Sequence, residues 1–222
     1  MNDFRFILFD LDGTLTDSGP GITNSVMYAL GRFGISVEDR SELYRFIGPP
    51  LLSSFKEFYG FDDSTAKKAV EYYREYYSDK GIFENTVYNG IPELLKQISG
   101  SGRKSALATS KPEKFAVQIL DHFGLSQYFS NITGASMTEA RTEKTELISI
   151  ALSALNIKDK SSAVMIGDRR FDIYGAAAND IASIGVLYGY GSHKELTDAG
   201  ADFIAETPQK IAELIALKGA VI

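Results

Sequence analysis

The chain has 222 residues, 44% of them hydrophobic, enough to form a sizeable core with or without a smaller second unit. Its net charge of -6 and its lack of a basic cluster argue against nucleic acids and anionic membranes as partners. It contains no cysteine, which excludes disulfides, a thiol nucleophile and thiolate zinc sites. Because we find no basic-then-apolar leader and no apolar run of membrane-spanning length, we expect a soluble cytoplasmic protein.

The first predicted element is a buried strand that ends in two acidic residues. Residues 6–9 form an uninterrupted apolar run, and Asp10 and Asp12 follow it. Strand geometry points both carboxylates to one side, and two like charges this close require a cation. Oxygen ligands suit a hard ion such as Mg2+, whereas the residues after Gly13 lack the spacing of a calcium loop. The alternative is a strand that simply ends in a polar turn.

The next region, residues 16–85, has a helical pattern throughout. Apolar residues recur at helical spacing, and the residues between them include typical helix caps and breakers. The expected helices begin after Ser18, near Glu38, after Pro50 and after Ser64. Four helices inserted after one buried strand predict a separate helical cap domain. The core domain would then comprise residues 1–15 and 86–222.

After residue 90, helices and short apolar strands alternate. Helices are expected at about 91–98, 112–123, 143–155, 172–178 and 208–217. Strands are expected at about 105–108, 131–134, 163–166, 183–187 and 202–204. Such alternation predicts an α/β fold, in which a doubly wound, Rossmann-like parallel sheet has right-handed crossovers. Ligands of such sheets bind beyond the carboxyl ends of the strands.

Polar residues follow the strands at positions where one site could form. Thr109 and Ser110 stand before a predicted helix start, where a hydroxyl and free N–H groups could cradle a phosphate; an ordinary helix cap explains them as well. Lys144 lies at another helix start, where cations are normally disfavoured, although a solvated surface lysine is the simpler explanation. Asp168 ends a buried strand and Asp172 follows one helical turn later, so both could face one pocket.

The segment Asp10-Leu11-Asp12-Gly13-Thr14 resembles the first motif of the haloacid dehalogenase-like (HAD) phosphohydrolases. Asp17-Ser18 and the following helix resemble the phosphoglycolate phosphatase-like branch, which carries a helical cap. The segments around Thr109, Lys144 and Asp168 match the remaining motifs in order and spacing. The resemblance therefore extends over nearly the whole chain.

This resemblance implies roles for the motif residues. Asp10 would be the nucleophile that forms an aspartyl-phosphate, and Asp12 the general acid and then the general base. Thr109 and Lys144 would hold the phosphoryl oxygens, and the family pattern favours Lys144 over the nearby Arg141.

The resemblance also implies a magnesium site and substrate contacts. Mg2+ would be bound by Asp10, Asp168 and the backbone carbonyl of Asp12, with Asp172 ordering its water shell. Further substrate contacts are expected from Gly13, Thr14, Ser110 and, in a cap loop, Gly48 and Pro49. The cap loop could equally be a tight turn between two helices. His193 is interpreted as a surface loop histidine.

We therefore predict a Mg2+-dependent phosphomonoesterase that acts on a small metabolite such as phosphoglycolate or a nucleoside monophosphate. A phosphosugar mutase is the second enzyme considered, but mutase relatives carry Val in place of Thr14 and a cap histidine where this chain has Asn24. A dehalogenase would lack Asp12 and the metal. A phospho-receiver switch shares the acidic cluster, but receiver domains have no helical insert after the first strand. The sequence predicts no oligomeric state.

Overall fold

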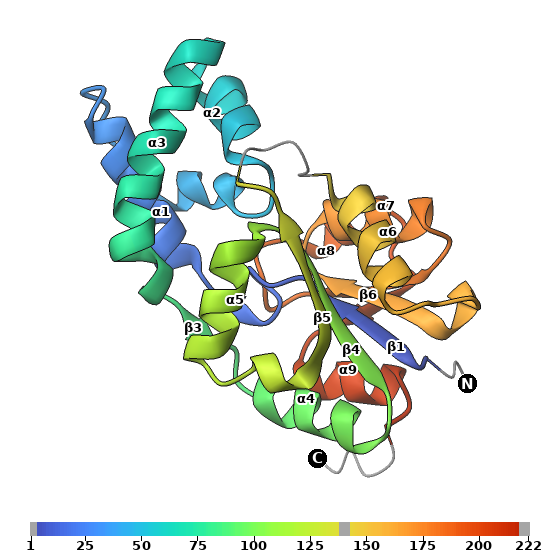
Figure 1. Cartoon of the computed structure of the whole chain (residues 1–222). Coiled ribbons are helices and arrows are strands. Elements are labelled where there is room, and N and C mark those ends of the chain that lie inside the picture. Colours follow the sequence, from blue (N-terminus) through green and yellow to red (C-terminus); the bar gives the residue numbers. More distant parts are fainter. Residues whose placement is uncertain (1–3, 138–142, 218–222) are drawn as a thin grey trace. The chain divides into compact units, whose positions relative to one another are not determined.

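The computed structural model describes residues 4–137 and 143–217, which divide into two compact units (Figure 1). Unit 1 consists of Met1–Thr16 and Val87–Ile222, and unit 2 consists of Asp17–Thr86. The chain leaves unit 1 at β2 (Thr16–Asp17) and returns at β3 (Thr86–Val87), and these two short strands pair with each other. The sequence pattern did not predict this pair, because two residues are too few to show a strand period.

Unit 1 is built on a sheet of six parallel strands in the order β5-β4-β1-β6-β7-β8. The strands are β1 (Phe6–Phe9), β4 (Lys104–Pro112), β5 (Phe129–Ala135), β6 (Ala163–Gly167), β7 (Ala182–Val186) and β8 (Phe203–Ala205). The predicted doubly wound α/β fold is confirmed. Chain order reverses at β1, which has β4 on one side and β6 on the other, and ligand sites form at such a reversal.

Helices cover both faces of this sheet. They are α4 (Ile91–Gly100), α5 (Glu113–His122), α6 (Lys144–Ala154), α7 (Arg170–Ala178), α8 (His193–Asp198) and α9 (Pro208–Leu214), with short 3-10 turns η3 (Ser126–Tyr128) and η4 (Lys160–Ser162). In Figure 1, α6 and α7 lie together on one face, and α4 and α9 lie on the other. Helix α8 was not predicted, since six residues show less than two helical turns of periodicity.

The central position of β1 explains its uninterrupted apolar sequence. Ile7, Leu8 and Phe9 have no exposed surface, because the strand has a neighbour on each side and helices on each face. Leu8 belongs to a core cluster with residues of α6 and α7, including Ile148 and Ala176. This packing fixes the end of β1, and the first acidic residue follows it directly.

Unit 2 is helical. It contains α1 (Gly19–Gly31), η1 (Arg40–Phe46), α2 (Leu51–Tyr59), α3 (Asp63–Asp79) and η2 (Gly81–Phe83). The element expected near Glu38 is the 3-10 helix η1 and not an α-helix. Edge-to-face packing of Phe46 on Phe55, with ring centroids 5.0 Å apart, contributes to the core of this unit. Among the residues that the structure describes, no helix is long and apolar enough to span a membrane.

Candidate active site

The sheet brings the ends of three adjacent strands together in unit 1. Asp10 follows β1, Asp168 follows β6, and Thr109 lies near the carboxyl end of β4. The backbone N–H of Asp10 donates a hydrogen bond to Ile166 O at 2.9 Å, which ties the end of β1 to β6. Residues far apart in the sequence therefore meet at one edge of the sheet.

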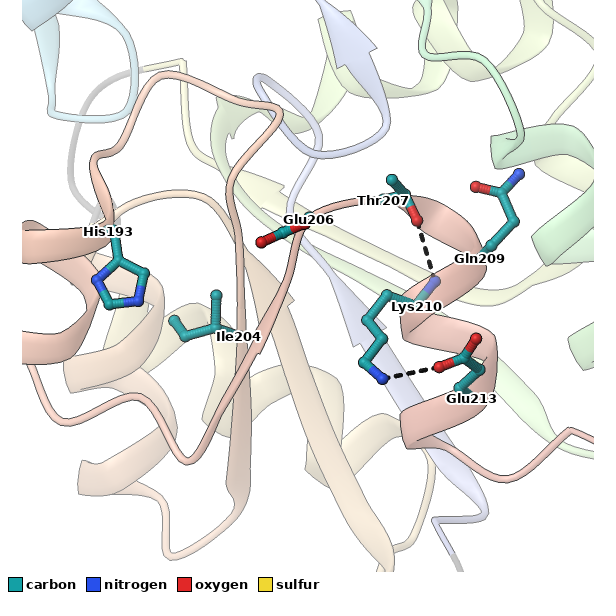
Figure 2. Close-up of a pocket in the computed structure, with 7 residues that line it drawn as sticks. All are labelled: His193, Ile204, Glu206, Thr207, Gln209, Lys210 and Glu213. Atoms are coloured by element: carbon teal, nitrogen blue, oxygen red, sulfur yellow. Dashed lines mark hydrogen bonds and ion pairs between the residues drawn. The ribbon is translucent and has the colours of Figure 1, made fainter. Parts of the chain in front are cut away.

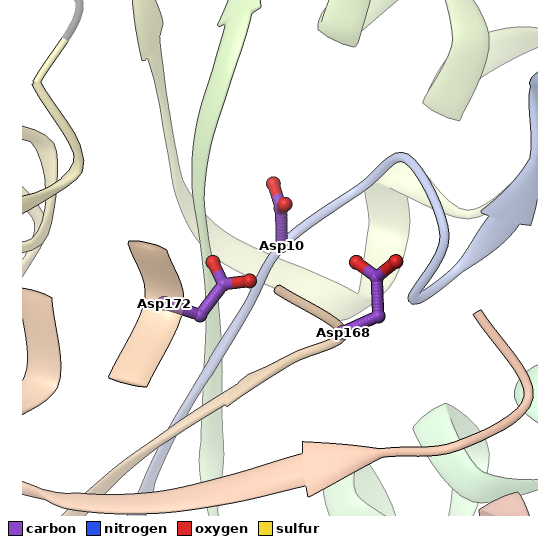
Figure 3. A group of neighbouring side chains, drawn as sticks. All are labelled: Asp10, Asp168 and Asp172. Atoms are coloured by element: carbon purple, nitrogen blue, oxygen red, sulfur yellow. The ribbon is translucent and has the colours of Figure 1, made fainter. Parts of the chain in front are cut away.

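Three carboxylates form a buried cluster at this edge (Figure 3). Oxygen atoms of Asp10, Asp168 and Asp172 lie within 4.8 Å of one another, and none of the three residues is more than 3% exposed. Asp172 comes from the first turn of α7, where its Oδ2 accepts a hydrogen bond from the backbone N–H of Arg169 at 3.1 Å. The Asp172 carboxylate is therefore as much a part of the cluster as those of Asp10 and Asp168.

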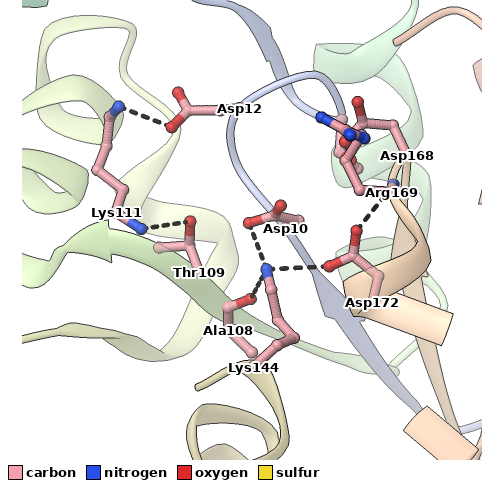
Figure 4. A network of polar contacts seen from close by, with 10 residues as sticks. Asp10, Asp12, Ala108, Thr109, Lys111, Lys144, Asp168, Arg169 and Asp172 are labelled. Atoms are coloured by element: carbon pink, nitrogen blue, oxygen red, sulfur yellow. Dashed lines mark hydrogen bonds and ion pairs between the residues drawn. The ribbon is translucent and has the colours of Figure 1, made fainter. Parts of the chain in front are cut away.

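Lys144 lies among these carboxylates (Figure 4). Its Nζ is 2.8 Å from Asp10 Oδ1 and 2.9 Å from Asp172 Oδ1, and it donates a hydrogen bond to Ala108 O at 3.1 Å. Burial by itself lowers the pKa of Lys144, but Asp10 and Asp172 outweigh burial and raise the pKa above that of free lysine. The two carboxylates thus explain a cation at the first residue of α6, where the helix dipole disfavours one.

The acidic cluster carries more negative charge than Lys144 neutralises. Burial raises the pKa of Asp168 well above that of free aspartate, and the charges of Asp172 and Asp10 raise it further. Burial likewise raises the pKa of Asp172 to about 6, although Lys144 acts in the opposite direction. A raised pKa favours the protonated form of a carboxyl group. Another positive charge near Asp168 and Asp172 would lower both pKa values and favour the ionised forms.

Asp12 has a separate cation partner. The chain turns after Asp10 instead of continuing as a strand, so the strand geometry assumed for Asp10 and Asp12 does not extend to Asp12. The Asp12 Oδ2 atom lies 2.7 Å from Lys111 Nζ, and both side chains are nearly buried (Figure 4). Sequence reasoning missed Lys111; its position beside Thr109 at the end of a buried strand was the only available signal.

The donor set fits one hard divalent cation. When all are ionised, the carboxylates of Asp10, Asp12, Asp168 and Asp172 carry four negative charges, and Lys111 and Lys144 carry two positive charges. The difference, four minus two, is the charge of one divalent ion. In addition, no described residue donates a hydrogen bond to the buried Oδ1 of Asp12. Oxygen donors of this kind suit Mg2+ better than a softer transition metal.

The turn after Asp10 brings backbone close to the carboxylate cluster. Gly13 has a φ of +81°, and a Cβ atom at this position would overlap Asp168 Oδ2. Its N–H donates to Thr16 O at 2.8 Å, which closes the turn. The hydroxyl of Thr14 lies 3.4 Å from Asp168 Oδ1. Only a glycine fits between this turn and Asp168.

Strand β4 continues further than predicted, so Thr109 and Ser110 lie within the strand. Its pairing with β5 becomes irregular between Thr109 and Pro112, and α5 starts only at Glu113. Thr109 is 1% exposed, and its Oγ1 accepts a hydrogen bond from the backbone N–H of Lys111 at 3.3 Å. Ser110 is half-buried beside it. The predicted phosphate cradle is therefore an irregular strand end and not the first turn of a helix.

The remaining predicted residues lie elsewhere. Gly48 and Pro49 connect η1 to α2 in unit 2, so their substrate contacts stay a prediction. Arg141 lies outside the described residues. His193 is exposed, but it is the first residue of α8 and not a loop residue as predicted. It lines a cavity of about 590 Å³ with Ile204 and residues of α9 (Figure 2). No member of the acidic cluster lines this cavity.

Comparison with known proteins agrees with this architecture. Residues 7–186 match the family model of the haloacid dehalogenase-like hydrolases. The match extends over most of the chain, and the protein therefore belongs to this family of enzymes. The resemblance that the motifs predicted is confirmed.

The chain is also similar to individual proteins. It is 48% identical to a 5'-nucleotidase from Pseudomonas aeruginosa over 190 residues, which are 86% of this chain and 86% of that protein. It is 38% identical to the tyrosine-protein kinase PtkA of Mycobacterium tuberculosis over 91% of this chain, which spans 66% of that protein. The crystal structure of a predicted phosphatase from Clostridium acetobutylicum shares 49% identity and a TM-score of 0.93, covering 96% of this chain and 98% of that chain.

The ion pair between Lys111 and Asp12 predicts a measurable contribution to stability. In Lys111→Met, Asp12 remains buried without its cation, and we expect the free energy of unfolding to fall by about 3 kcal/mol in urea denaturation. The double variant Lys111→Met with Asp12→Asn should recover most of this loss, because no uncompensated charge remains. The exposed pair of Lys194 and Asp198 provides the control, and Lys194→Met should have almost no effect. Equal effects of the two lysine variants would contradict a stabilising role for the buried pair.

Proposed function

We propose that the protein is a Mg2+-dependent phosphomonoesterase that hydrolyses a small-metabolite ester through an aspartyl-phosphate on Asp10. The observation that carries the proposal is the buried cluster of Asp10, Asp168 and Asp172 around Lys144 at the carboxyl end of the sheet. Membership of the HAD hydrolase family supports the same reaction class. A carboxylate is a weak nucleophile toward an anionic ester, so positive charge beside it is essential.

In the first step, a carboxylate oxygen of Asp10 bonds to phosphorus while the bond from phosphorus to the leaving oxygen breaks. Lys144 and the Thr109 hydroxyl hold the phosphoryl oxygens. Asp12 takes part in this step in its protonated form and gives that proton to the leaving oxygen, so that the product departs as an alcohol. Lys111 keeps the Asp12 side chain in place before the substrate arrives.

In the second step, Asp12 takes a proton from a water molecule, which attacks phosphorus and releases inorganic phosphate with the Asp10 carboxylate restored. Asp10, Asp168 and the backbone carbonyl of Asp12 would hold Mg2+, and Asp172 would order its water shell. When bound, Mg2+ supplies positive charge that offsets the charge on the transferring oxygens.

Unit 2 has the role of a cap in this proposal. It is a helical unit, Asp17–Thr86, inserted between β1 and the rest of the sheet domain. Its assignment as the cap domain expected at residues 16–85 is part of this proposal. A cap that covers the site excludes water during the first step and limits the size of the substrate. Gly48 and Pro49 would contact the substrate from this unit.

The similarity to the 5'-nucleotidase from Pseudomonas aeruginosa favours a nucleoside monophosphate as the substrate. Phosphoglycolate is the second ester to test, because the motifs resemble the branch named after it. A panel of both classes, assayed by phosphate release with Mg2+ present, distinguishes them through kcat/KM.

Phosphoryl transfer to an acceptor other than water is the second candidate function. The similarity to PtkA, a tyrosine-protein kinase by name, is the observation that favours it. A phosphosugar mutase and a phospho-receiver switch would also keep the phosphoryl group on an acceptor or on Asp10. Incubation with ATP and a tyrosine peptide, or with a sugar phosphate and its bisphosphate, separates these reactions from hydrolysis.

Replacement of Asp10 tests the nucleophile. We expect Asp10→Asn to lower kcat/KM for p-nitrophenyl phosphate at least about a thousandfold, because an amide does not attack phosphorus. The wild-type enzyme quenched during turnover should contain a phosphoryl group on Asp10 that hydroxylamine removes. The exposed Asp198→Asn is the matched control and should retain full activity. Activity of Asp10→Asn near the wild-type value would rule out this mechanism.

Metal binding should be visible in thermal stability without any substrate. We expect saturating Mg2+ to raise the Tm of the wild-type chain by about 5 °C or more, because the ion binds only the folded site. Asp168→Asn should lose this increase, while its Tm without metal should not fall, because the variant removes a buried charge that repels Asp10 and Asp172. A Mg2+ response that survives in Asp168→Asn would place the ion elsewhere.

A further inference from the structure

The loop Tyr188–Gly191, which connects β7 to α8, packs directly against Asp168. The backbone N–H of Tyr190 donates a hydrogen bond to Asp168 Oδ2 at 2.8 Å. Asp168 has no exposed surface, so this hydrogen bond from the protein takes the place of one from solvent. The sequence places this loop at the functional edge of the sheet, but it gives no sign of the contact with Asp168.

Glycine backbones enclose the same oxygen. A Cβ atom on Gly189 would lie 2.6 Å from Asp168 Oδ2 and would also overlap the carbonyl oxygen of Gly13. A Cβ atom on Gly13 would overlap Asp168 Oδ2 and would lie 2.8 Å from Oδ1, so Oδ2 is the more closely approached of the two oxygens. Two chain segments therefore lie so close to this carboxylate that a side chain at either glycine would displace it.

The loop region contacts both chain segments that supply the carboxylates, namely the turn after Asp10 and the segment of Asp168. The Tyr188 hydroxyl donates to Thr14 O at 3.1 Å, in the turn that follows Asp10. Burial, followed by the charge of Asp168, raises the pKa of Tyr188, so its hydroxyl remains a donor. Just beyond the loop, Glu195 Oε1 lies 2.9 Å from Arg169 Nε, next to Asp168 in the sequence. The loop thus holds the nucleophile turn and the Asp168 segment together.

Asp168 Oδ1 is held much less firmly, since its only hydrogen bond among the described residues is the 3.4 Å contact with the Thr14 hydroxyl. We infer that loop Tyr188–Gly191 positions Asp168 so that only Oδ1 is available to a metal ion, and that it thereby favours Mg2+ over Ca2+. Mg2+ takes one oxygen per carboxylate in strict octahedral geometry, whereas the larger Ca2+ readily takes two. The inference rests on the proposed magnesium site and adds the element that sets its ion preference.

Matched glycine variants of the full chain test this inference. Gly189→Ala forces Asp168 or the Gly13 carbonyl to move, whereas a Cβ atom on Gly100 of the same unit meets nothing within 4 Å. Thermal-shift titrations with MgCl2 and with CaCl2, without substrate, give an apparent Kd for each ion. We expect Gly189→Ala to weaken Mg2+ binding about tenfold or more and Ca2+ binding less. Gly100→Ala should retain the wild-type preference for Mg2+.

Tyr188→Phe provides a second variant that introduces no steric overlap, because it removes only the hydrogen bond to Thr14. We expect Tyr188→Phe to shift the ratio of the Mg2+ and Ca2+ Kd values in the same direction by a smaller factor. If Gly189→Ala does not fold, Tyr188→Phe alone tests the inference. Wild-type ion preference in every folded variant would overturn the inference. Failure of the underlying magnesium site gives a different result, since neither ion would then stabilise the wild-type chain.

Discussion

The structure depends on the compensation of buried negative charge at the carboxyl end of β1. Asp10, Asp168 and Asp172 are brought together beside a single lysine, and such a group of carboxylates is strongly unfavourable without cations. Lys144 supplies one positive charge at the centre, and Lys111 supplies another to Asp12. In the proposed function, the remaining deficit of two charges is compensated by one divalent ion.

The fold allows this arrangement at the place where its central strands end. Parallel strands β4, β1 and β6 end at the same edge, and chain order reverses at β1. Packing of Leu8 against α6 and α7 fixes the strand from which Asp10 projects, and the same two helices bring Lys144 and Asp172. Core packing and charge compensation therefore share their elements, so a change in the packing of α6 also displaces the central lysine.

Much of this was predictable from the sequence, for physical reasons that differ between elements. The apolar runs of β1 and β6 and the acidic residues after them are local patterns, and they correctly predicted a parallel sheet with Asp10 and Asp168 at its edge. The pairing of Lys111 with Asp12 could not be predicted, because it joins residues 99 positions apart and depends on an irregular strand end.

The loop Tyr188–Gly191 shows the same limit. Its glycines indicate a turn in the sequence, but their close approach to Asp168 exists only in the folded chain. Backbone donors such as the N–H of Tyr190 carry no residue-specific signal at all, since every residue except proline has one. The sequence therefore indicated the acidic residues and Lys144, but it indicated neither Lys111 nor the uncharged backbone that contacts Asp168.

The central claim is that one divalent ion binds between Asp10 and Asp168. Anomalous diffraction from crystals soaked in Mn2+, used in place of Mg2+, tests it most directly. We predict a single strong peak about 2.1 Å from one oxygen of each of these two residues. An anomalous map without a peak between them, or with its strongest peak elsewhere on the chain, would contradict it.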